Sequence, residues 1–112
     1  MEGAFPPPPV KGSERLVPIT TWAEMFRETQ ITGVEFDEFW CDRVEAGVAY
    51  FFHWLGEPQF TVLVVFDDQG PSLIECRKFC DVLACENESE PIIAEVMQLF
   101  SDAGFRRSEV EQ

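Results

Sequence analysis

Basic residues are scarce in this sequence. Its 112 residues include eight Lys and Arg against 21 Asp and Glu, so the formal net charge is −13. A chain with this imbalance repels nucleic-acid phosphate and anionic lipid surfaces. We therefore expect no direct nucleic-acid or membrane partner, and expect instead another protein with a basic or an apolar surface.

Long apolar runs are missing as well. No stretch approaches the ~18 apolar residues that a membrane span requires. The first residues, MEGAFPPPPVKG, do not place an apolar segment after a cationic one, which is the pattern of a secretory signal. We expect a cytoplasmic protein in which the cysteines remain thiols; these are Cys41, Cys76, Cys80 and Cys85.

Motifs for catalysis and cofactor binding are also absent from the sequence. It contains no Gly-rich phosphate loop and no calcium-loop spacing. The gaps of three and four residues between Cys76, Cys80 and Cys85 are not the short paired knuckles of a structural zinc site. His53, the single histidine, could activate a thiolate, but its place in an aromatic segment favours a hydrogen-bonded structural role. We expect no enzyme, no cofactor and no metal.

What the chain does contain is apolar and aromatic. Hydrophobic residues make up 46%, with eleven Phe and three Trp, which is typical of a folded domain and not of a disordered acidic segment. The length suits one domain. We predict a flexible proline-rich arm at 1–14, a single α+β domain at 15–105 and a short polar tail at 106–112.

Two segments predict a central antiparallel hairpin. Residues 48–55, VAYFFHWL, and residues 60–66, FTVLVVF, are apolar on both of their alternating faces. A strand that faces solvent on one side alternates apolar and polar residues, so both surfaces of this hairpin require a cover.

Two helices are predicted at 21–30 and 91–103. The first follows a threonine pair that can cap its amino terminus, and it ends before Gly33. The second carries Pro91 in its first turn, and Gly104 follows its end.

Two further segments fit either a helix or a strand. In residues 34–46 a helical stripe of apolar residues competes with aromatic and β-branched composition, and we predict a strand with a bulge near Asp37 and Glu38. Residues 72–85 show a capped amphipathic pattern and are predicted as a helix, with a strand through Leu73 to Phe79 as the alternative. The expected fold is α+β: a small antiparallel sheet of three or four strands with two or three helices packed mainly on one face.

Helices on one face would leave the other face of the hairpin open. Tyr50, Phe52 and Trp54 share a face, and their exposed area would exceed what a monomer tolerates. We predict that they form the apolar interface of a homodimer or of a complex with an obligate partner. A compact monomer whose helices cover both faces is the alternative.

Carboxylates far from basic residues predict an acidic patch. Between residues 28 and 68 the only basic residue is Arg43. We predict a non-enzymatic acidic protein-binding module that occupies a basic, nucleic-acid-binding surface of another protein, by analogy of charge and size with small immunity proteins and phage-encoded inhibitors of defence nucleases. The residues expected to form the patch are Glu35, Asp37, Glu38, Asp42, Asp67 and Asp68.

Two alternative functions remain open. One is a dimeric acidic secretion or assembly chaperone that holds a client segment in apolar grooves. The other is an adaptor: FPPPP at 5–9 resembles the ligand core of EVH1 domains, and Pro6, Pro9 and Lys11 have the spacing of an SH3 ligand. No acidic residue stands directly before Phe5, where the EVH1 pattern has one.

Overall fold

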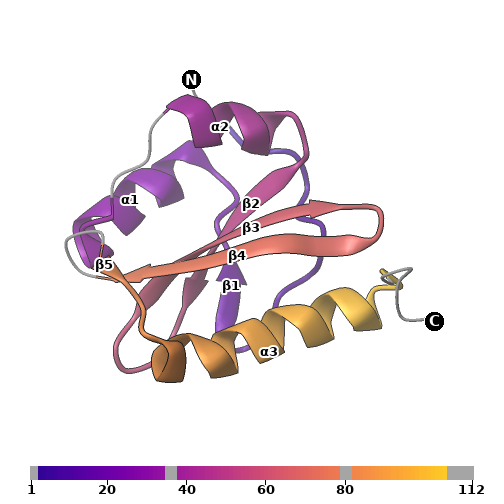
Figure 1. Ribbon diagram of the computed structural model, residues 1–112. Helices are drawn as coiled ribbons and strands as arrows, with labels where there is room; N and C mark the ends of the chain where they lie inside the picture. Colours follow the sequence, from indigo (N-terminus) through magenta and orange to yellow (C-terminus); the bar gives the residue numbers. More distant parts are fainter. Residues whose placement is uncertain (1–2, 35–37, 79–81, 106–112) are drawn as a thin grey trace.

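A five-stranded antiparallel sheet forms the centre of the computed structural model, which describes residues 3–34, 38–78 and 82–105. The strands follow one another in chain order across the sheet (Figure 1). The predicted α+β class is confirmed, with five strands where three or four were expected. They are β1 (Leu16–Pro18), β2 (Ala49–Trp54), β3 (Phe60–Asp67), β4 (Gly70–Lys78) and β5 (Val82–Leu83).

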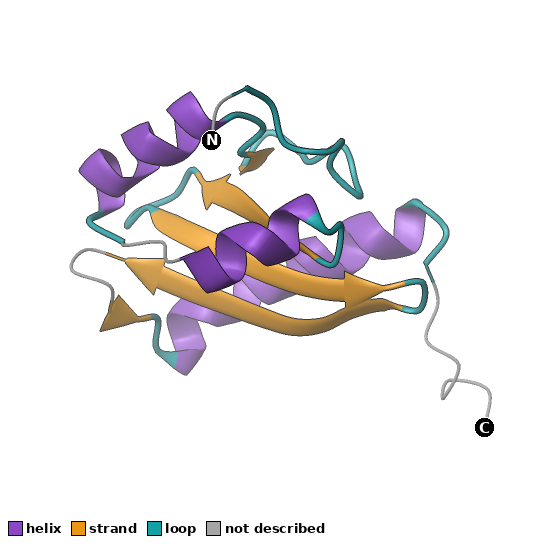
Figure 2. Cartoon of the chain, turned by 90° about the horizontal axis from the view of Figure 1, so that it is seen from above, coloured by secondary structure: helices purple, strands orange, loops and turns teal. Residues whose placement is uncertain are grey.

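Three helices cover this sheet. Helices α1 (Trp22–Thr32) and α2 (Glu38–Glu45) lie on one face, and α3 (Glu86–Asp102) crosses the other. Figure 2 looks down on α1 and α2 with α3 beneath the sheet. Two of the three helices therefore share a face, and the third covers the surface that was expected to be open.

The proposed apolar interface is wrong because its residues are core residues. Tyr50, Phe52 and Trp54 have exposed fractions of 2%, 0% and 6% within the single chain. Helix α3 begins at Glu86, earlier than predicted, and buries Ile92, Val96 and Phe100. The homodimer and chaperone predictions lose this face as their physical basis.

The proline-rich segment also belongs to the core. Phe5 and Val10 are 6% and 5% exposed, and the Phe5 ring meets those of Trp22 and Tyr50 edge-on at 4.8 and 6.3 Å. The Phe5 N–H donates to the Thr20 carbonyl at 2.8 Å. The prediction of an arm outside the fold is therefore wrong for residues 3–14. An EVH1 or SH3 domain would have to displace this packing to read the motif.

Residues 38–45 form a helix, so the predicted strand at 34–46 is wrong; its bulge position Asp37 lies outside the described residues. The apolar stripe prevails because Val44 is fully buried. The helix ends in a Schellman motif: the Gly47 N–H donates to the Val44 carbonyl and the Val48 N–H to the Arg43 carbonyl, each at 3.1 Å. Gly47 has φ = 82°, a conformation that glycine adopts without a steric penalty.

Residues 70–78 form a strand, so the predicted helix over 72–85 is wrong and its alternative is closer. Strand β3 lies between β2 and β4, which satisfies its backbone groups on both sides. The two strands of the hairpin meet at Asp67 and Gly70, and the Gln69 N–H donates to Asp67 Oδ1 at 2.8 Å. Because side-chain and backbone pairing with β3 outweigh the weak 3–4 periodicity, the segment becomes a strand that lies between β3 and β5.

The caps of α1 are confirmed. Thr21 Oγ1 accepts the Glu24 N–H at 3.1 Å, and the Glu24 carboxylate accepts the Thr20 N–H at 2.7 Å. Gly33 adopts the left-handed conformation at the end of the helix. No helix in the described part of the chain is long and apolar enough to cross a membrane.

Candidate functional site

The predicted acidic patch is only partly within the described residues. Asp42, Asp67 and Asp68 are exposed, Asp42 on α2 and the other two at the β3–β4 turn. Glu35 and Asp37 lie outside the described residues, and Glu38 begins α2 without a described side-chain environment.

Three elements bring exposed carboxylates to one end of the sheet. The Phe66 N–H donates to the Val48 carbonyl at 3.0 Å, which ties the exit of α2 to the end of β3. The Phe66 and Phe100 rings lie 5.7 Å apart, which ties the same point to the last turns of α3. Figure 1 shows the β3–β4 turn and the end of α3 at one side of the molecule. We call this surface the acidic end; its exposed residues are Asp42, Glu45, Asp67, Asp68 and Asp102.

The electrostatics of the acidic end are unfavourable for the chain itself. Glu45 and Asp102 occupy the last turns of α2 and α3, where the helix dipole is negative. Within the described residues no ion pair involves any of the five carboxylates. Arg43 is the basic residue closest in sequence to Asp42 and Glu45. Its guanidinium donates to the Phe39 carbonyl at 3.2 Å and lies over the Phe39 ring.

A second polar site lies at the opposite end of β2, between α1 and the sheet. Glu28 on α1 is only 4% exposed. Its Oε2 lies 2.6 Å from His53 Nδ1 and accepts a hydrogen bond from Thr61 Oγ1 at 2.5 Å. Thr61 Oγ1 in turn lies 2.9 Å from Thr32 Oγ1. This network satisfies a carboxylate that would be costly to bury alone.

The geometry favours a protonated His53. Its Nε2 lies 2.6 Å from Gln59 Oε1, so each ring nitrogen faces an oxygen atom. Only the imidazolium form donates from both nitrogens. The hydrogen bond to the Glu28 carboxylate raises the pKa of His53 above its ordinary value, although burial acts in the opposite direction.

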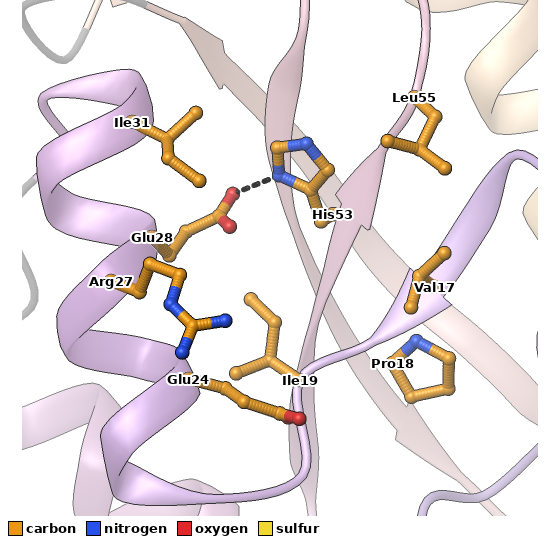
Figure 3. A pocket seen from close by; sticks show the side chains of 9 residues that line it. All are labelled: Val17, Pro18, Ile19, Glu24, Arg27, Glu28, Ile31, His53 and Leu55. Atoms are coloured by element: carbon orange, nitrogen blue, oxygen red, sulfur yellow. Dashed lines mark hydrogen bonds and ion pairs between the residues drawn. The ribbon is translucent and has the colours of Figure 1, made fainter.

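The His53–Glu28 pair borders an open cavity of about 260 Å³ (Figure 3). In this view the Glu28 carboxylate and the Arg27 guanidinium face the cavity from α1, and His53 faces it from β2. The Glu24 side chain of α1 also lines the cavity, and the remaining walls are apolar side chains from β1, α1 and the segments that follow β1 and β2: Val17, Pro18, Ile19, Ile31 and Leu55.

The sequence reasoning placed His53 in a hydrogen-bonded role but missed Glu28. A signal for it existed: Met25, Glu28 and Thr32 recur at the three- and four-residue spacing of one helical face, and these are the buried residues of α1. Phe26, an aromatic residue of the same helix, lies off this face and is 70% exposed.

The thiols do not assemble a reactive centre among the described residues. Cys41 and Cys76 are buried and Cys85 is exposed, none of these three forms a disulfide, and Cys80 lies outside the described residues. Burial raises the pKa of the Cys76 thiol to about 12, which opposes formation of a nucleophilic thiolate. In the same part of the chain, no group of three or more His, Cys, Asp or Glu side chains is placed to hold a metal ion.

Comparisons of this chain with protein-family models, with curated proteins and with solved structures found no match.

Proposed function

We propose that the protein is a non-enzymatic acidic binding module that docks its acidic end on a basic surface of another protein. The observation that carries this proposal is the gathering, at one end of the sheet, of exposed carboxylates that form no ion pair as far as the described residues extend. Two of them, Glu45 and Asp102, also oppose the dipoles of the helices that they end. A basic partner would relieve that repulsion, since it supplies the cations that the chain lacks there.

The partner surface expected from this arrangement is one that ordinarily binds nucleic acid. Such surfaces present several Lys and Arg side chains to phosphates. The formal charge of −13 would steer the module toward such a surface over a distance set by the Debye length of about 8 Å at physiological salt. An inhibitor or immunity-type role follows if the occupied surface is the working surface of a nuclease or of another nucleic-acid enzyme.

The acids near the start of α3 are a weaker candidate surface. Glu88 forms an ion pair with Lys78 at 2.7 Å, and acids in the first turn of a helix are favoured by its dipole. These carboxylates are already compensated within the chain, so a partner would gain less by contacting them.

Two triple variants of equal net charge compare the acidic end with exposed acids elsewhere on the molecule. The triple variant Asp42→Asn, Asp67→Asn, Asp68→Asn neutralises the acidic end, and Glu57→Gln, Glu86→Gln, Glu90→Gln neutralises exposed acids elsewhere. Binding of a Lys-rich peptide is measured by calorimetry at low salt. We expect the first variant to bind about tenfold more weakly than the second, on the scale of a few charged contacts. Equal losses in both variants would show that only net charge matters and would refute a defined site.

A further inference from the structure

The cavity between α1 and β1 holds a carboxylate oxygen that the chain does not use. The Glu28 side chain is 5% exposed, and both of its hydrogen bonds reach Oε2. Oε1 accepts none from the described residues. Figure 3 shows this second oxygen directed toward the middle of the cavity. This oxygen is reached from the open cavity, and a carboxylate oxygen without a donor can accept a charge-assisted hydrogen bond from an ammonium group.

A positive group faces the same cavity from the preceding residue. Arg27 is exposed, and no ion pair or hydrogen bond of its guanidinium is found within 3–34, 38–78 and 82–105. In Figure 3 its guanidinium extends into the space beside Glu28. Guanidinium binds carboxylates in a two-pronged geometry, so the cavity offers an acceptor for a cation next to a donor group for an anion.

The rest of the cavity suits a branched apolar group. Val17, Ile31 and Leu55 are 39%, 49% and 49% exposed and converge on it from β1, α1 and the end of β2. The cavity volume of about 260 Å³ is close to the roughly 300 Å³ of the smallest ordinary ligand pockets. The cavity therefore suits one small ligand. An apolar ligand group would remove these three side chains from water.

We propose that this cavity is a binding site for a small zwitterion with an apolar body, such as a free branched-chain amino acid. Its ammonium group contacts Glu28 Oε1, its carboxylate contacts Arg27, and its side chain packs between Val17, Ile31 and Leu55. This site is independent of the acidic end, because it lies at the opposite end of β2. No bond is made or broken; the site only binds.

Three ligands that share one carbon skeleton test the proposal. L-leucine carries both charged groups, isoamylamine lacks the carboxylate, and isocaproic acid lacks the ammonium group. Binding to the full chain is followed by titration of backbone amide NMR signals near His53 and Ile31. We expect L-leucine to bind with a dissociation constant on the order of 1 mM and each analogue to bind about tenfold more weakly or worse, since each loses a charged contact.

Two variants assign the contacts to residues. Arg27→Gln changes an exposed side chain and should leave the fold intact; it is expected to abolish the preference for L-leucine over isoamylamine. Glu28→Gln should abolish the preference for L-leucine over isocaproic acid, with circular dichroism reporting whether α1 remains folded. Glu90→Gln, on the exposed side of α3, is the matched control and should change neither preference.

Two results would overturn the proposal. One is the absence of amide shifts near the cavity with L-leucine at about 50 mM, well above the expected dissociation constant. The other is an unchanged preference for L-leucine in Arg27→Gln, which would place the carboxylate contact elsewhere. Because the acidic end is untouched by these variants, neither result bears on binding of the basic peptide.

Discussion

Glu28 and His53 show how one pair of polar residues helps to position a helix against a sheet. The buried residues of α1 are Met25, Glu28 and Thr32, so a single apolar side chain and two polar ones face the sheet. Polar groups at such positions destabilise unless they are fully hydrogen-bonded. Here the His53 ring and the Thr61 hydroxyl supply donors to Glu28 Oε2, and the contact with His53 is strongest when the imidazole is protonated.

Stability should consequently fall as pH rises. The pKa of His53 is raised in the folded chain, whereas the unfolded chain has the ordinary value of about 6.5. The contribution of His53 to the free energy of unfolding is therefore complete below pH ~6.5. It is lost as pH rises through the folded-state pKa of His53. Urea unfolding at a series of pH values above 6 should show this decline. His53→Gln should remove it, and an unchanged pH dependence in that variant would contradict the assignment.

Tyr50 presents the opposite case, a polar atom without a partner. Its hydroxyl is buried and makes no hydrogen bond within the described residues. Burial, together with the charge of Glu24, raises the pKa of Tyr50 to about 12. Tyr50→Phe removes the unsatisfied group, so we expect a free energy of unfolding equal to the wild type or higher by about 1 kcal/mol. A loss above about 1 kcal/mol would reveal a hydrogen-bond partner, such as a buried water.

At the scale of elements, the N-terminal residues 3–14 pack against the core through Phe5 and Val10. We call this segment the strap. Phe5 lies against Trp22 on α1 and Tyr50 on β2. Four prolines after Phe5 limit the conformations available to the unfolded segment and so reduce the entropy lost on docking.

Removal of the Phe5 ring should therefore destabilise the whole fold. Phe5→Ala is expected to lower the free energy of unfolding by about 3 kcal/mol, as for other buried aromatic truncations. Pro7→Ala, at an exposed position of the same segment, is the control and should change it by less than about 0.5 kcal/mol. If both variants match the wild type, the segment is free in solution and the strap does not exist.

The ends of α2 and α3 carry charges that oppose their own dipoles. Neutralising them should stabilise the fold, so Glu45→Gln and Asp102→Asn are each expected to raise the free energy of unfolding by about 0.3–1 kcal/mol at low salt. Thermal unfolding at low and high salt measures the gain and its screening. A loss of stability in both variants would mean that the chain compensates these carboxylates, which would remove the electrostatic basis of the acidic end.

Elements whose signals were local and unambiguous could be predicted from the sequence. The β2–β3 pairing follows from two neighbouring apolar runs joined by a short turn, and the caps of α1 follow from Thr21, Glu24 and Gly33. Segments whose state depends on a neighbour could not. Residues 70–78 form a strand because they pair with β3 along its length, and the need of β3 for a partner leaves no periodicity in the segment that pairs with it.

The candidate sites divide in the same way. The exposure of Asp67 and Asp68 follows from their place in a turn, whereas their proximity to Asp102 depends on where α3 crosses the sheet. Glu28 could be noticed on the buried stripe of α1, but its partners His53 and Thr61 lie 25 and 33 residues away in sequence. Only the antiparallel register that pairs His53 with Thr61 brings both to one carboxylate.

At the scale of the whole molecule, the chain shields its own aromatic hairpin and leaves its charge unbalanced. Helices lie on both faces of the sheet, and Phe51 and Phe52, which point to opposite faces, are 4% and 0% exposed, so apolar association is not required to complete the core. The surplus of 13 negative charges includes exposed carboxylates such as Glu45 and Asp102, which lie at helix ends where the dipole makes them least favourable. Natural proteins deviate from such local rules mainly at functional sites.

The salt dependence of basic-peptide binding tests this account most directly. The dissociation constant for a Lys-rich peptide is measured between about 50 and 200 mM salt for the wild type and for the Asp42→Asn, Asp67→Asn, Asp68→Asn variant. A defined acidic end predicts a steep loss of affinity with salt in the wild type and a clearly shallower dependence in the variant. Identical slopes for the two proteins, or no dependence on salt, would contradict it.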